Sequence, residues 1–346
     1  MTWCEAIRGF VCVRCAKNHK IVRRKFWNWQ NYYALKCGFC GKYHPALDYL
    51  EYAGKHPWQL HPEMRKKREG LDPSTELKPI PDEYVPFKDV VSEGQISQAW
   101  SRLAHEWAKG YTEYGDLNRQ YVIDPVIFRL TGHVKGLDVL DAGCGNGYLS
   151  RLLTKKGAKV IGIDISDEFI QMAKQKEKQL PMGIKYHLGS ICDINVCNDE
   201  TFDIVISNLA LMDLPDLDRA LKELHRVLKR GGKLIFSIMH PCFASPPIHG
   251  WVRTPFDTDR KEDRIYWKVD RCFDKTMEMW RLSAEGSPLY SFHRPLSEYI
   301  KTLLRHGFMI TDFEEPVPSK EAIEKHYREF GDEYDRVPWF LIIGAR

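Results

Sequence analysis

The ten residues Val139–Tyr148 constrain the fold of this 346-residue chain more than any other segment. An apolar run ends in Asp141, and three glycines at alternate positions follow before a segment with helical periodicity. So tight a strand-to-helix turn needs glycine, which takes left-handed backbone angles freely and lets a ligand approach the backbone. A second apolar run, Val160–Asp164, ends in another carboxylate about 20 residues further on, where a strand tip can hydrogen-bond ribose hydroxyls. The two segments predict a nucleoside-binding βαβ unit.

Strands and helices are expected to alternate from Leu137 onward. The predicted strands are 138–141, 160–164, 184–187, 201–208, 233–239, 308–313 and 337–345. The predicted helices are 96–107, 121–132, 148–156, 216–229 and 296–306, with one more capped by Ser166. Such alternation predicts an α/β fold with a mostly parallel sheet and helices on both faces. Ligands of this architecture bind at the carboxyl ends of the strands, beside the topological switch point.

Four cysteines near the N-terminus form two closely spaced pairs, Cys12 with Cys15 and Cys37 with Cys40. Two intervening residues let both thiolates of one turn reach a tetrahedral ion at about 2.3 Å. Segments 21–27 and 32–36, between the pairs, have the pattern of short strands. A module of about 50 residues buries too little core to fold alone, so a metal would supply much of its folding energy. We therefore predict a structural Zn²⁺ in a small zinc ribbon; the alternative is four buried thiols without metal.

Charge is distributed unevenly along the chain. Up to Gly70 there are fourteen Lys and Arg against five Asp and Glu, a local charge of +9 in a chain whose total is +4. The remaining residues therefore carry −5. A basic module attached to a mildly acidic body favours an anionic partner, such as RNA or an acidic protein, although a solubilising surface is the alternative.

The length of 346 residues predicts one large domain or two unequal ones. We place a basic zinc-ribbon-like module at 1–70, a proline-bearing linker at 71–95 and the main domain at 96–346. Apolar runs fall short of the ~18 residues that span a bilayer, and the N-terminus lacks the pattern of a signal peptide. A cytoplasmic protein with reduced thiols and no membrane partner is therefore expected.

Four motifs in the main domain match those of one enzyme family. They are Val139–Gly147, Ile161–Ser166, Phe202–Ala210 and Leu221–Leu234. In these motifs the chain resembles the class I S-adenosylmethionine-dependent methyltransferases, of the ubiquinone-biosynthesis-like and small-molecule type. The resemblance covers roughly residues 100–346 and implies a seven-stranded Rossmann-like sheet whose last strand runs antiparallel. A dehydrogenase is disfavoured because its Gly-x-Gly-x-x-Gly pattern is absent from the turn.

The resemblance also implies which residues bind the cofactor S-adenosylmethionine. The glycine turn would approach the methionine half, Asp141 would orient the turn and reach the ammonium, and Asp164 would accept from the ribose diol. Cys192 and Asp193 would meet the adenine edge. The full set of expected cofactor-binding residues is Asp141, Gly143, Gly145, Gly147, Asp164, Ile165, Cys192, Asp193 and Asn208.

The methyl acceptor is constrained less sharply. The residues after Asn208 are Leu-Ala-Leu and not the Pro-Pro-aromatic sequence typical of enzymes that methylate adenine or glutamine amides. His240 follows a predicted strand, where it could deprotonate a nucleophile, and His293 is a second catalytic candidate; either could instead serve only the local structure. The aromatic-rich insertion 243–292 is predicted to form a lid, with 266–271 and 276–282 paired as a hairpin.

Two functional hypotheses follow from these features. The first is a methyltransferase acting on an O, N, S or C nucleophile of a small molecule enclosed by the lid. The alternative is an RNA or protein methyltransferase that docks its substrate through the basic module. A binding protein that has lost catalysis is disfavoured by the complete glycine turn and both cofactor carboxylates.

Overall fold

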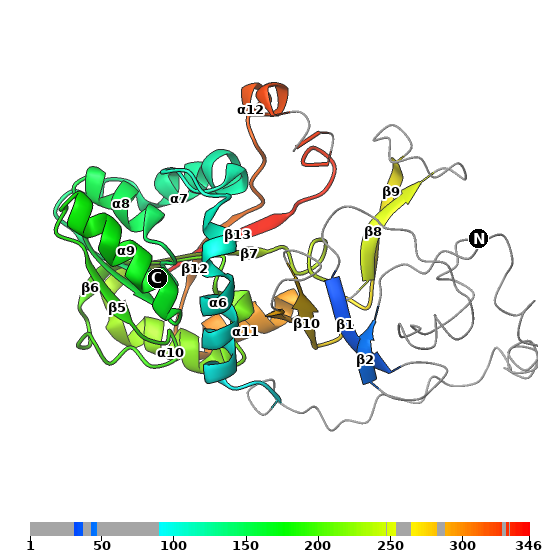
Figure 1. Cartoon of the computed structure of the whole chain (residues 1–346), viewed down its shortest axis with the longest axis horizontal. Helices are drawn as coiled ribbons and strands as arrows, with labels where there is room; N and C mark the ends of the chain where they lie inside the picture. The colour runs from blue at the N-terminus through cyan, green and yellow to red at the C-terminus, as the bar shows by residue number, and fades with distance from the viewer. Residues whose placement is uncertain are drawn as a thin grey trace, which may run out of the picture. The chain divides into compact units, whose positions relative to one another are not determined.

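The computed structural model of the chain describes residues 31–36, 43–46, 90–246, 248–253, 264–281, 288–326, 330–331 and 333–346. These residues belong to two compact units (Figure 1). One unit comprises Met1–Val90 with Met277–Pro288, and the other comprises Val91–Thr276 with Leu289–Arg346.

A seven-stranded sheet forms the centre of the second unit, in the order β12-β13-β7-β6-β3-β4-β5. Its strands are β3 (Asp138–Ala142), β4 (Lys159–Asp164), β5 (Lys185–Leu188), β6 (Phe202–Asn208), β7 (Leu228–Met239), β12 (Ile310–Glu314) and β13 (Phe340–Ala345). β13 is antiparallel to both of its neighbours, β7 and β12, while the pairs from β7 to β5 are parallel. The predicted seven-stranded Rossmann-like sheet with an antiparallel last strand is confirmed.

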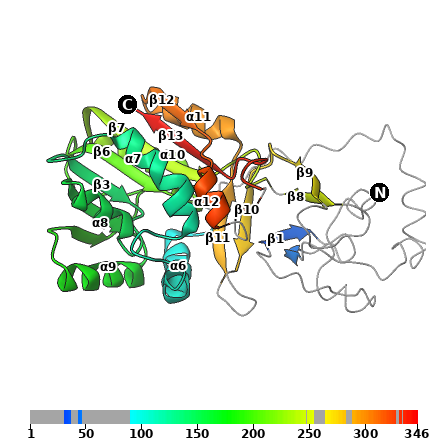
Figure 2. The ribbon, with the colours of Figure 1, turned by 90° about the horizontal axis from the view of Figure 1, so that it is seen from above.

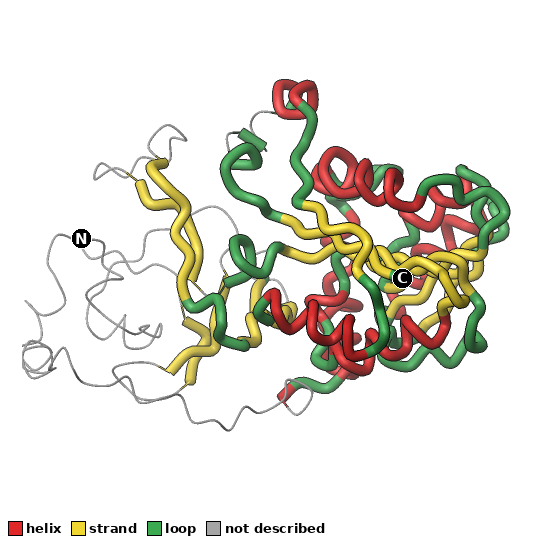
Figure 3. Tube along the Cα trace, turned by 180° about the vertical axis from the view of Figure 1, so that it is seen from behind, coloured by secondary structure: helices red, strands yellow, loops and turns green. Residues whose placement is uncertain are grey.

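Helices cover both faces of this sheet, as the strand sequences require. In Figure 1, α7 (Asp124–Thr131) and α8 (Tyr148–Lys155) lie above the sheet, and α10 (Leu217–Val227) and α11 (Leu296–Arg305) lie below it. Figure 3 shows the same layering from behind. The remaining helices are α6 (Glu93–Ala108), α9 (Asp167–Gln179) and α12 (Lys320–Lys325), together with the short turns η1 (Arg119–Ile123) and η2 (Leu211–Asp213).

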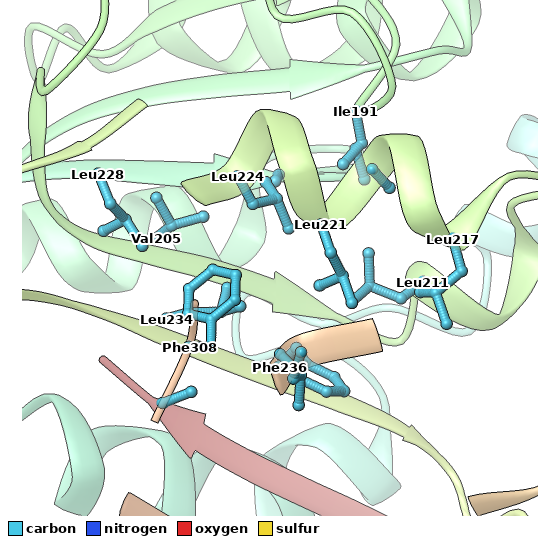
Figure 4. Packing of buried hydrophobic residues seen from close by; sticks show 14 of the residues in the cluster. Ile191, Val205, Leu211, Leu217, Leu221, Leu224, Leu228, Leu234, Phe236 and Phe308 are labelled. Atoms are coloured by element: carbon cyan, nitrogen blue, oxygen red, sulfur yellow. The ribbon is translucent and has the colours of Figure 1, made fainter. Parts of the chain in front are cut away.

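Two hydrophobic cores hold these layers together, one on each face of the sheet. Adjacent residues of β3 illustrate the division, because Val139 belongs to the core under α7 and α8 and Leu140 belongs to the core under α10. On α10, Leu217, Leu221 and Leu224 recur at helical spacing and are all buried against the sheet (Figure 4). A strand buried on both faces reads as a continuous apolar run, which is how β13 appears in the sequence.

Polar side chains cap two of the helices near the site and fix the residues at which those helices begin. The Ser166 hydroxyl accepts a hydrogen bond from the Phe169 N–H at 3.3 Å and caps α9, as the sequence predicts. Ser92 and Gln95 form a capping box at the start of α6, which packs against α9 (Figure 2). The strand order reverses between β3 and β6, so the carboxyl ends of these two strands flank the crevice where ligands bind in such sheets.

The predicted lid contains strands, but their pairing differs from the expectation. β8 (Ile248–Arg253) pairs antiparallel with β9 (Arg264–Asp270), with Trp251 opposite Trp267. The predicted hairpin between 266–271 and 276–282 is therefore wrong, because alternation identifies a strand but does not name its partner. β11 (Leu289–His293) then leads into α11.

In the first unit, three described strands pair in the order β10-β1-β2. β1 (Asn31–Lys36) lies between β10 (Thr276–Trp280) and β2 (Tyr43–Ala46), antiparallel to both. The strand predicted at 32–36 is confirmed. The four predicted zinc ligands, Cys12, Cys15, Cys37 and Cys40, lie outside the described residues, and no group of three or more potential ligands is found within them.

No helix in the described part of the chain is long and apolar enough to cross a membrane.

Candidate functional site

The turn between β3 and α8, residues 143–147, contains three glycines with left-handed backbones. Their φ angles are +82° at Gly143, +52° at Gly145 and +76° at Gly147. A Cβ at Gly143 would lie 2.6 Å from the Cβ of Ala210, and a Cβ at Gly147 would lie 2.7 Å from Cζ of Tyr186. At Gly145 a Cβ would meet no described atom within 4 Å. Packing therefore excludes side chains at the first and third glycines, while the middle one faces open space that a ligand can occupy.

Asp164 joins this turn to the tip of β4. Its Oδ2 accepts a hydrogen bond from the Gly145 N–H at 2.8 Å, and its Oδ1 accepts one from the Ser166 N–H at 2.9 Å. Burial raises the pKa of Asp164 to about 6, against these hydrogen bonds, which lower it. Each carboxylate oxygen keeps a lone pair for a ligand hydroxyl. The adjacent Ile165 is half-buried, and its carbonyl accepts from the Ser97 hydroxyl of α6 at 2.7 Å.

Asp141 is more deeply enclosed than its predicted role implies. Its side chain is buried, and Oδ2 accepts a hydrogen bond from the Ser150 hydroxyl at 2.6 Å. Burial raises its pKa to about 6, and the nearby charge of Asp164 raises it further. Asp141 thus links β3 to α8, and direct contact with the cofactor stays a prediction.

The residues expected near adenine follow β5. Cys192 is buried, and burial raises its thiol pKa to about 12, so it is a neutral packing group and not a nucleophile. Its backbone N–H donates to the Ser190 hydroxyl at 3.0 Å. Asp193 is exposed, and its Oδ2 forms a long ion pair with Arg219 Nη2 at 3.8 Å. A carboxylate has about four lone-pair sites, so it can still accept from an exocyclic amine.

Asn208 ends β6 on the other side of the crevice. Its Oδ1 accepts from the Ser237 hydroxyl at 2.6 Å, and its Nδ2 donates to the Tyr148 hydroxyl at 2.8 Å. The next residue, Leu209, has a φ of +54°, a conformation that costs a side-chain-bearing residue about 1–3 kcal/mol. Such strain, held by a 3.0 Å bond from the Leu209 N–H to the Ser237 hydroxyl, is typical of functional sites. No pattern in the sequence marks Leu209.

A buried polar cluster lies beside Asn208, and the sequence reasoning missed it. Asp124 accepts hydrogen bonds from the Tyr148 hydroxyl at 3.1 Å and from Asn208 Nδ2 at 3.2 Å. Arg119 is also buried; it pairs with Asp116 and lies over the Tyr111 ring at 5.1 Å. Arg119 begins a π-helical turn, a feature that often accompanies functional sites. The sequence does contain a signal for this cluster. Arg119 and Asp124 are charged residues in a segment whose apolar neighbours are expected to be buried.

His240 lies just after β7, with both ring nitrogens engaged. Nδ1 accepts from the Cys242 N–H at 3.1 Å, so the ring proton is on Nε2, which donates to Glu315 Oε1 at 2.9 Å. Burial lowers the pKa of His240 and keeps the ring neutral, although Glu315 opposes this effect. To act as a base toward an acceptor, His240 would have to exchange one of these partners, and its catalytic role stays a prediction.

His293, at the end of β11, is held in a similar way. Its Nε2 lies 3.1 Å from the Cys272 carbonyl and its Nδ1 lies 3.3 Å from the Ser245 hydroxyl. Burial lowers its pKa as well. The Ser245 N–H donates to the His240 carbonyl at 3.2 Å, so the structure brings both histidines to the 240–245 loop. The glycine turn, Asp164 and Asn208 form a separate group at the switch point.

An aromatic cavity adjoins this loop. It has a volume of about 310 Å³, and Phe243, Trp251, Tyr266 and Trp267 line it together with Arg336. The rings of Trp251 and Trp267 meet edge to face at 5.2 Å, and the Arg336 guanidinium lies 4.4 Å from the Trp251 ring centroid. The Phe243 ring lies 4.9 Å from that of His240. The β8–β9 hairpin thus provides an aromatic wall next to the predicted catalytic loop.

The sheet order, the glycine turn and the carboxylate at the tip of β4 define a Rossmann-like nucleoside-binding protein. A sequence profile described as a methyltransferase domain matches residues 140–236. A solved S-adenosylmethionine-dependent methyltransferase from Mesorhizobium loti is 28% identical, with a TM-score of 0.56 over 68% of this chain and 100% of that one. A Listeria monocytogenes structure, assigned provisionally to the same class, is 31% identical over 64% of this chain and 95% of that one, with a TM-score of 0.52. The chain belongs to the S-adenosylmethionine-dependent methyltransferase family.

Two curated relatives indicate the part of the family that the chain is similar to. A ubiquinone biosynthesis O-methyltransferase from Coxiella burnetii is 35% identical over 147 residues, which are 42% of this chain and 61% of that protein. A malonyl-[acyl-carrier protein] O-methyltransferase from Hamiltonella defensa is 33% identical over 153 residues, which are 44% of this chain and 55% of that protein. The chain therefore spans less than two thirds of the length of each of these two relatives.

Proposed function

We propose that this chain transfers the methyl group of S-adenosylmethionine to a small-molecule acceptor with an oxygen, nitrogen, sulfur or carbon nucleophile. The observation that carries the proposal is the pairing of the open backbone at Gly145 with the Asp164 carboxylate, joined by a 2.8 Å hydrogen bond. The open turn fits the approach of the methionine half, and the carboxylate fits a ribose diol. Asp193, exposed after β5, fits the exocyclic amine of adenine, and the adjacent buried Cys192 is proposed to pack beside the adenine ring.

When bound, S-adenosylmethionine supplies a methyl group activated by a positive sulfonium. The chain's contribution is to orient the acceptor in line with that group and to exclude water. The strained Leu209 and the hydrogen bonds of Asn208 fix the backbone at the end of β6, beside the glycine turn. Fixed backbone at the switch point favours a single orientation of the reacting groups.

A small molecule is favoured as the acceptor by the aromatic cavity. A volume of about 310 Å³ suits a compact ligand, and its walls of Trp251, Tyr266 and Trp267 suit an apolar or aromatic one. Two O-methyltransferases among the relatives point in the same direction. The sequence after Asn208 also lacks the Pro-Pro-aromatic pattern of adenine and glutamine methylation.

His240 and His293 are proposed to act at the acceptor end of the site. Both hold the 240–245 loop, and that loop carries Phe243 of the cavity wall. His240→Asn is expected to lower turnover at least tenfold while leaving cofactor affinity unchanged, as expected for loss of an acceptor contact or base. Equal losses in turnover and cofactor affinity would argue for a purely structural histidine.

The N-terminal module is proposed to hold a structural Zn²⁺ through Cys12, Cys15, Cys37 and Cys40. The second cysteine pair, Cys37 and Cys40, lies in the sequence between Lys36 and Tyr43, where the pairing of β1 with β2 ends. This pairing is an argument for a zinc site at the second cysteine pair. Paired strands before and after a Cys-x-x-Cys favour a zinc knuckle. Elemental analysis of the purified chain should find one zinc, and Cys37→Ser with Cys40→Ser should abolish it.

The basic charge of the module leads us to propose an anionic partner, either RNA or an acidic protein, in a cytoplasmic setting. Docking through phosphates predicts that RNA affinity falls steeply with salt. If neutralising Arg23, Arg24 and Lys25 leaves both RNA binding and methylation of cell extract unchanged, the module has no such role in substrate docking.

Calorimetric titration with S-adenosylhomocysteine tests the cofactor assignment. Asp164→Ala should weaken binding at least tenfold, because it removes the ribose acceptor and the anchor of the Gly145 N–H. Asp167→Ala is the matched control, since this carboxylate lies in the first turn of α9 and contacts only Gln171 among the interactions described. Wild-type affinity in Asp164→Ala would remove the basis of the proposal. Transfer of labelled methyl groups into fractionated small molecules, RNA and protein then identifies the acceptor.

A further inference from the structure

One oxygen of the buried Asp124 side chain lacks a hydrogen-bond partner. Asp124 is 3% exposed, and its Oδ1 accepts from both Tyr148 and Asn208. Its Oδ2 is fully buried and finds no partner among the described residues. A buried acceptor without a partner is costly, and native structures retain one mainly where a ligand or another function uses it.

The two residues that hold Asp124 place it at the crevice. Tyr148 directly follows Gly147 of the glycine turn, and Asn208 is the last residue of β6. β3 and β6 are neighbours at the point where the strand order reverses. Asp124 therefore lies where the glycine turn meets the end of β6, the region proposed for the methionine half of the cofactor.

The charges around Asp124 favour a cationic ligand. Arg119 is the nearby cation, but it is paired with Asp116 through its side chain and its backbone N–H. Burial raises the pKa of Asp124 to about 7, and the negative charge of Asp116 adds to this, while Arg119, Tyr148 and Asn208 lower it. Tyr111, from the loop after α6, has its pKa raised to about 12 and is neutral. A buried carboxylate in these surroundings is stabilised by a positively charged hydrogen-bond donor.

We propose that Oδ2 of Asp124 accepts a hydrogen bond from the α-ammonium of the cofactor's methionine end. The inference rests on the proposed function. It moves this role from Asp141, whose Oδ2 is already bonded to Ser150, to a residue of α7 outside the four motifs. Under this proposal α7 belongs to the cofactor site. The residue that recognises the amino-acid end of the ligand then precedes the first strand of the seven-stranded sheet in the sequence.

Two ligands that differ only at the amino-acid end test this assignment. S-Adenosylhomocysteine carries the ammonium, whereas 5′-methylthioadenosine has the same nucleoside and sulfur but lacks the amino acid. Asp124→Asn should weaken binding of the first by at least tenfold and leave the second within twofold, as measured by calorimetry. Glu113→Gln is the control, because that exposed carboxylate pairs with Lys155 on the surface and should change neither affinity.

Proton release provides a second readout that needs no variant. Pairing with an ammonium lowers the pKa of Asp124, so at pH 7 S-adenosylhomocysteine should release up to about half a proton more than 5′-methylthioadenosine. Titrations in buffers of different ionisation enthalpy measure this difference. The contribution of Asp164 toward the shared ribose cancels between the two ligands. Asp141, with a pKa of about 6, is mostly ionised at pH 7 and can release only about a tenth of a proton.

The outcomes separate the two proposals. If neither ligand binds the wild type, the methyltransferase function itself fails. If both ligands bind but release equal numbers of protons, or if Asp124→Asn weakens both by the same factor, only the assignment of Asp124 is overturned. Unchanged affinity for both ligands together with reduced methyl transfer would place Asp124 at the acceptor instead and would equally overturn the assignment.

Discussion

The glycine turn allows stability and ligand binding to be separated by two single substitutions. Gly143→Ala and Gly145→Ala both place a side chain on a left-handed backbone, which costs about 1–2 kcal/mol. At Gly143 the new methyl also collides with Ala210 at 2.6 Å, and overpacking of this kind adds about 1–3 kcal/mol. The reduced entropy of the unfolded chain returns roughly 0.4–1 kcal/mol in both variants. We expect a loss of about 1 kcal/mol in unfolding free energy for Gly145→Ala and about 3 kcal/mol for Gly143→Ala, from these same terms.

Ligand affinity should not follow this order of stability. The methyl group of Gly145→Ala projects into the open space in front of the turn, where the cofactor is proposed to lie. S-Adenosylhomocysteine should therefore bind this variant at least tenfold more weakly, a loss of about 1.4 kcal/mol, although it is the more stable of the two. Urea unfolding measures the stabilities and calorimetry measures the affinities. Wild-type affinity in Gly145→Ala, or equal stability of the two variants, would refute the reasoning.

Two further predictions concern the core and the pH dependence of stability. Leu221→Ala, on the buried face of α10, should lower the unfolding free energy by about 3 kcal/mol in urea titrations, while Lys222→Ala on the same helix should change it by less than about 0.5 kcal/mol. The folded-state pKa of Asp141 is raised to about 6, so the folded state binds the proton of this carboxyl more tightly than the unfolded state does. The contribution of Asp141 to the free energy of unfolding therefore decreases as pH rises from about 4 to 6. Asp141→Asn should remove that contribution, so the stability difference between wild type and variant should change over this pH window; a constant difference would contradict the assignment.

Local patterns were sufficient to predict the strands and helices of the sheet domain. Period-2 runs and caps such as Ser166 are properties of neighbouring residues, and six of the seven sheet strands begin and end within three residues of the predicted positions. The exception is β7, which begins at Leu228, inside the predicted helix 216–229. Partner choice was not predictable in the same way. The lid strand 266–271 pairs with 248–253 and not with 276–282, because register and partner depend on which surfaces meet in three dimensions.

The residues of the candidate site also fall into two groups, those that the sequence predicted and those that only the structure revealed. The glycine turn, Asp164 and Asn208 could be read from the sequence because short segments carry the chemistry of nucleoside binding. Asp124 and Leu209 could not, since one is defined by a missing hydrogen-bond partner and the other by a backbone angle. The two histidines were identified as candidates, but only the structure shows that both of their ring nitrogens are engaged.

The sequence alone determined that this protein has a nucleoside-binding α/β sheet of the S-adenosylmethionine-dependent methyltransferase type, because the turn, the strand-end carboxylates and the buried strands are encoded locally. The tertiary structure decided which side chains surround the crevice between β3 and β6. Residues as distant in the chain as Asp124, Tyr148 and Asn208 form one hydrogen-bonded cluster there, since the switch in strand order brings their elements to the same edge of the sheet.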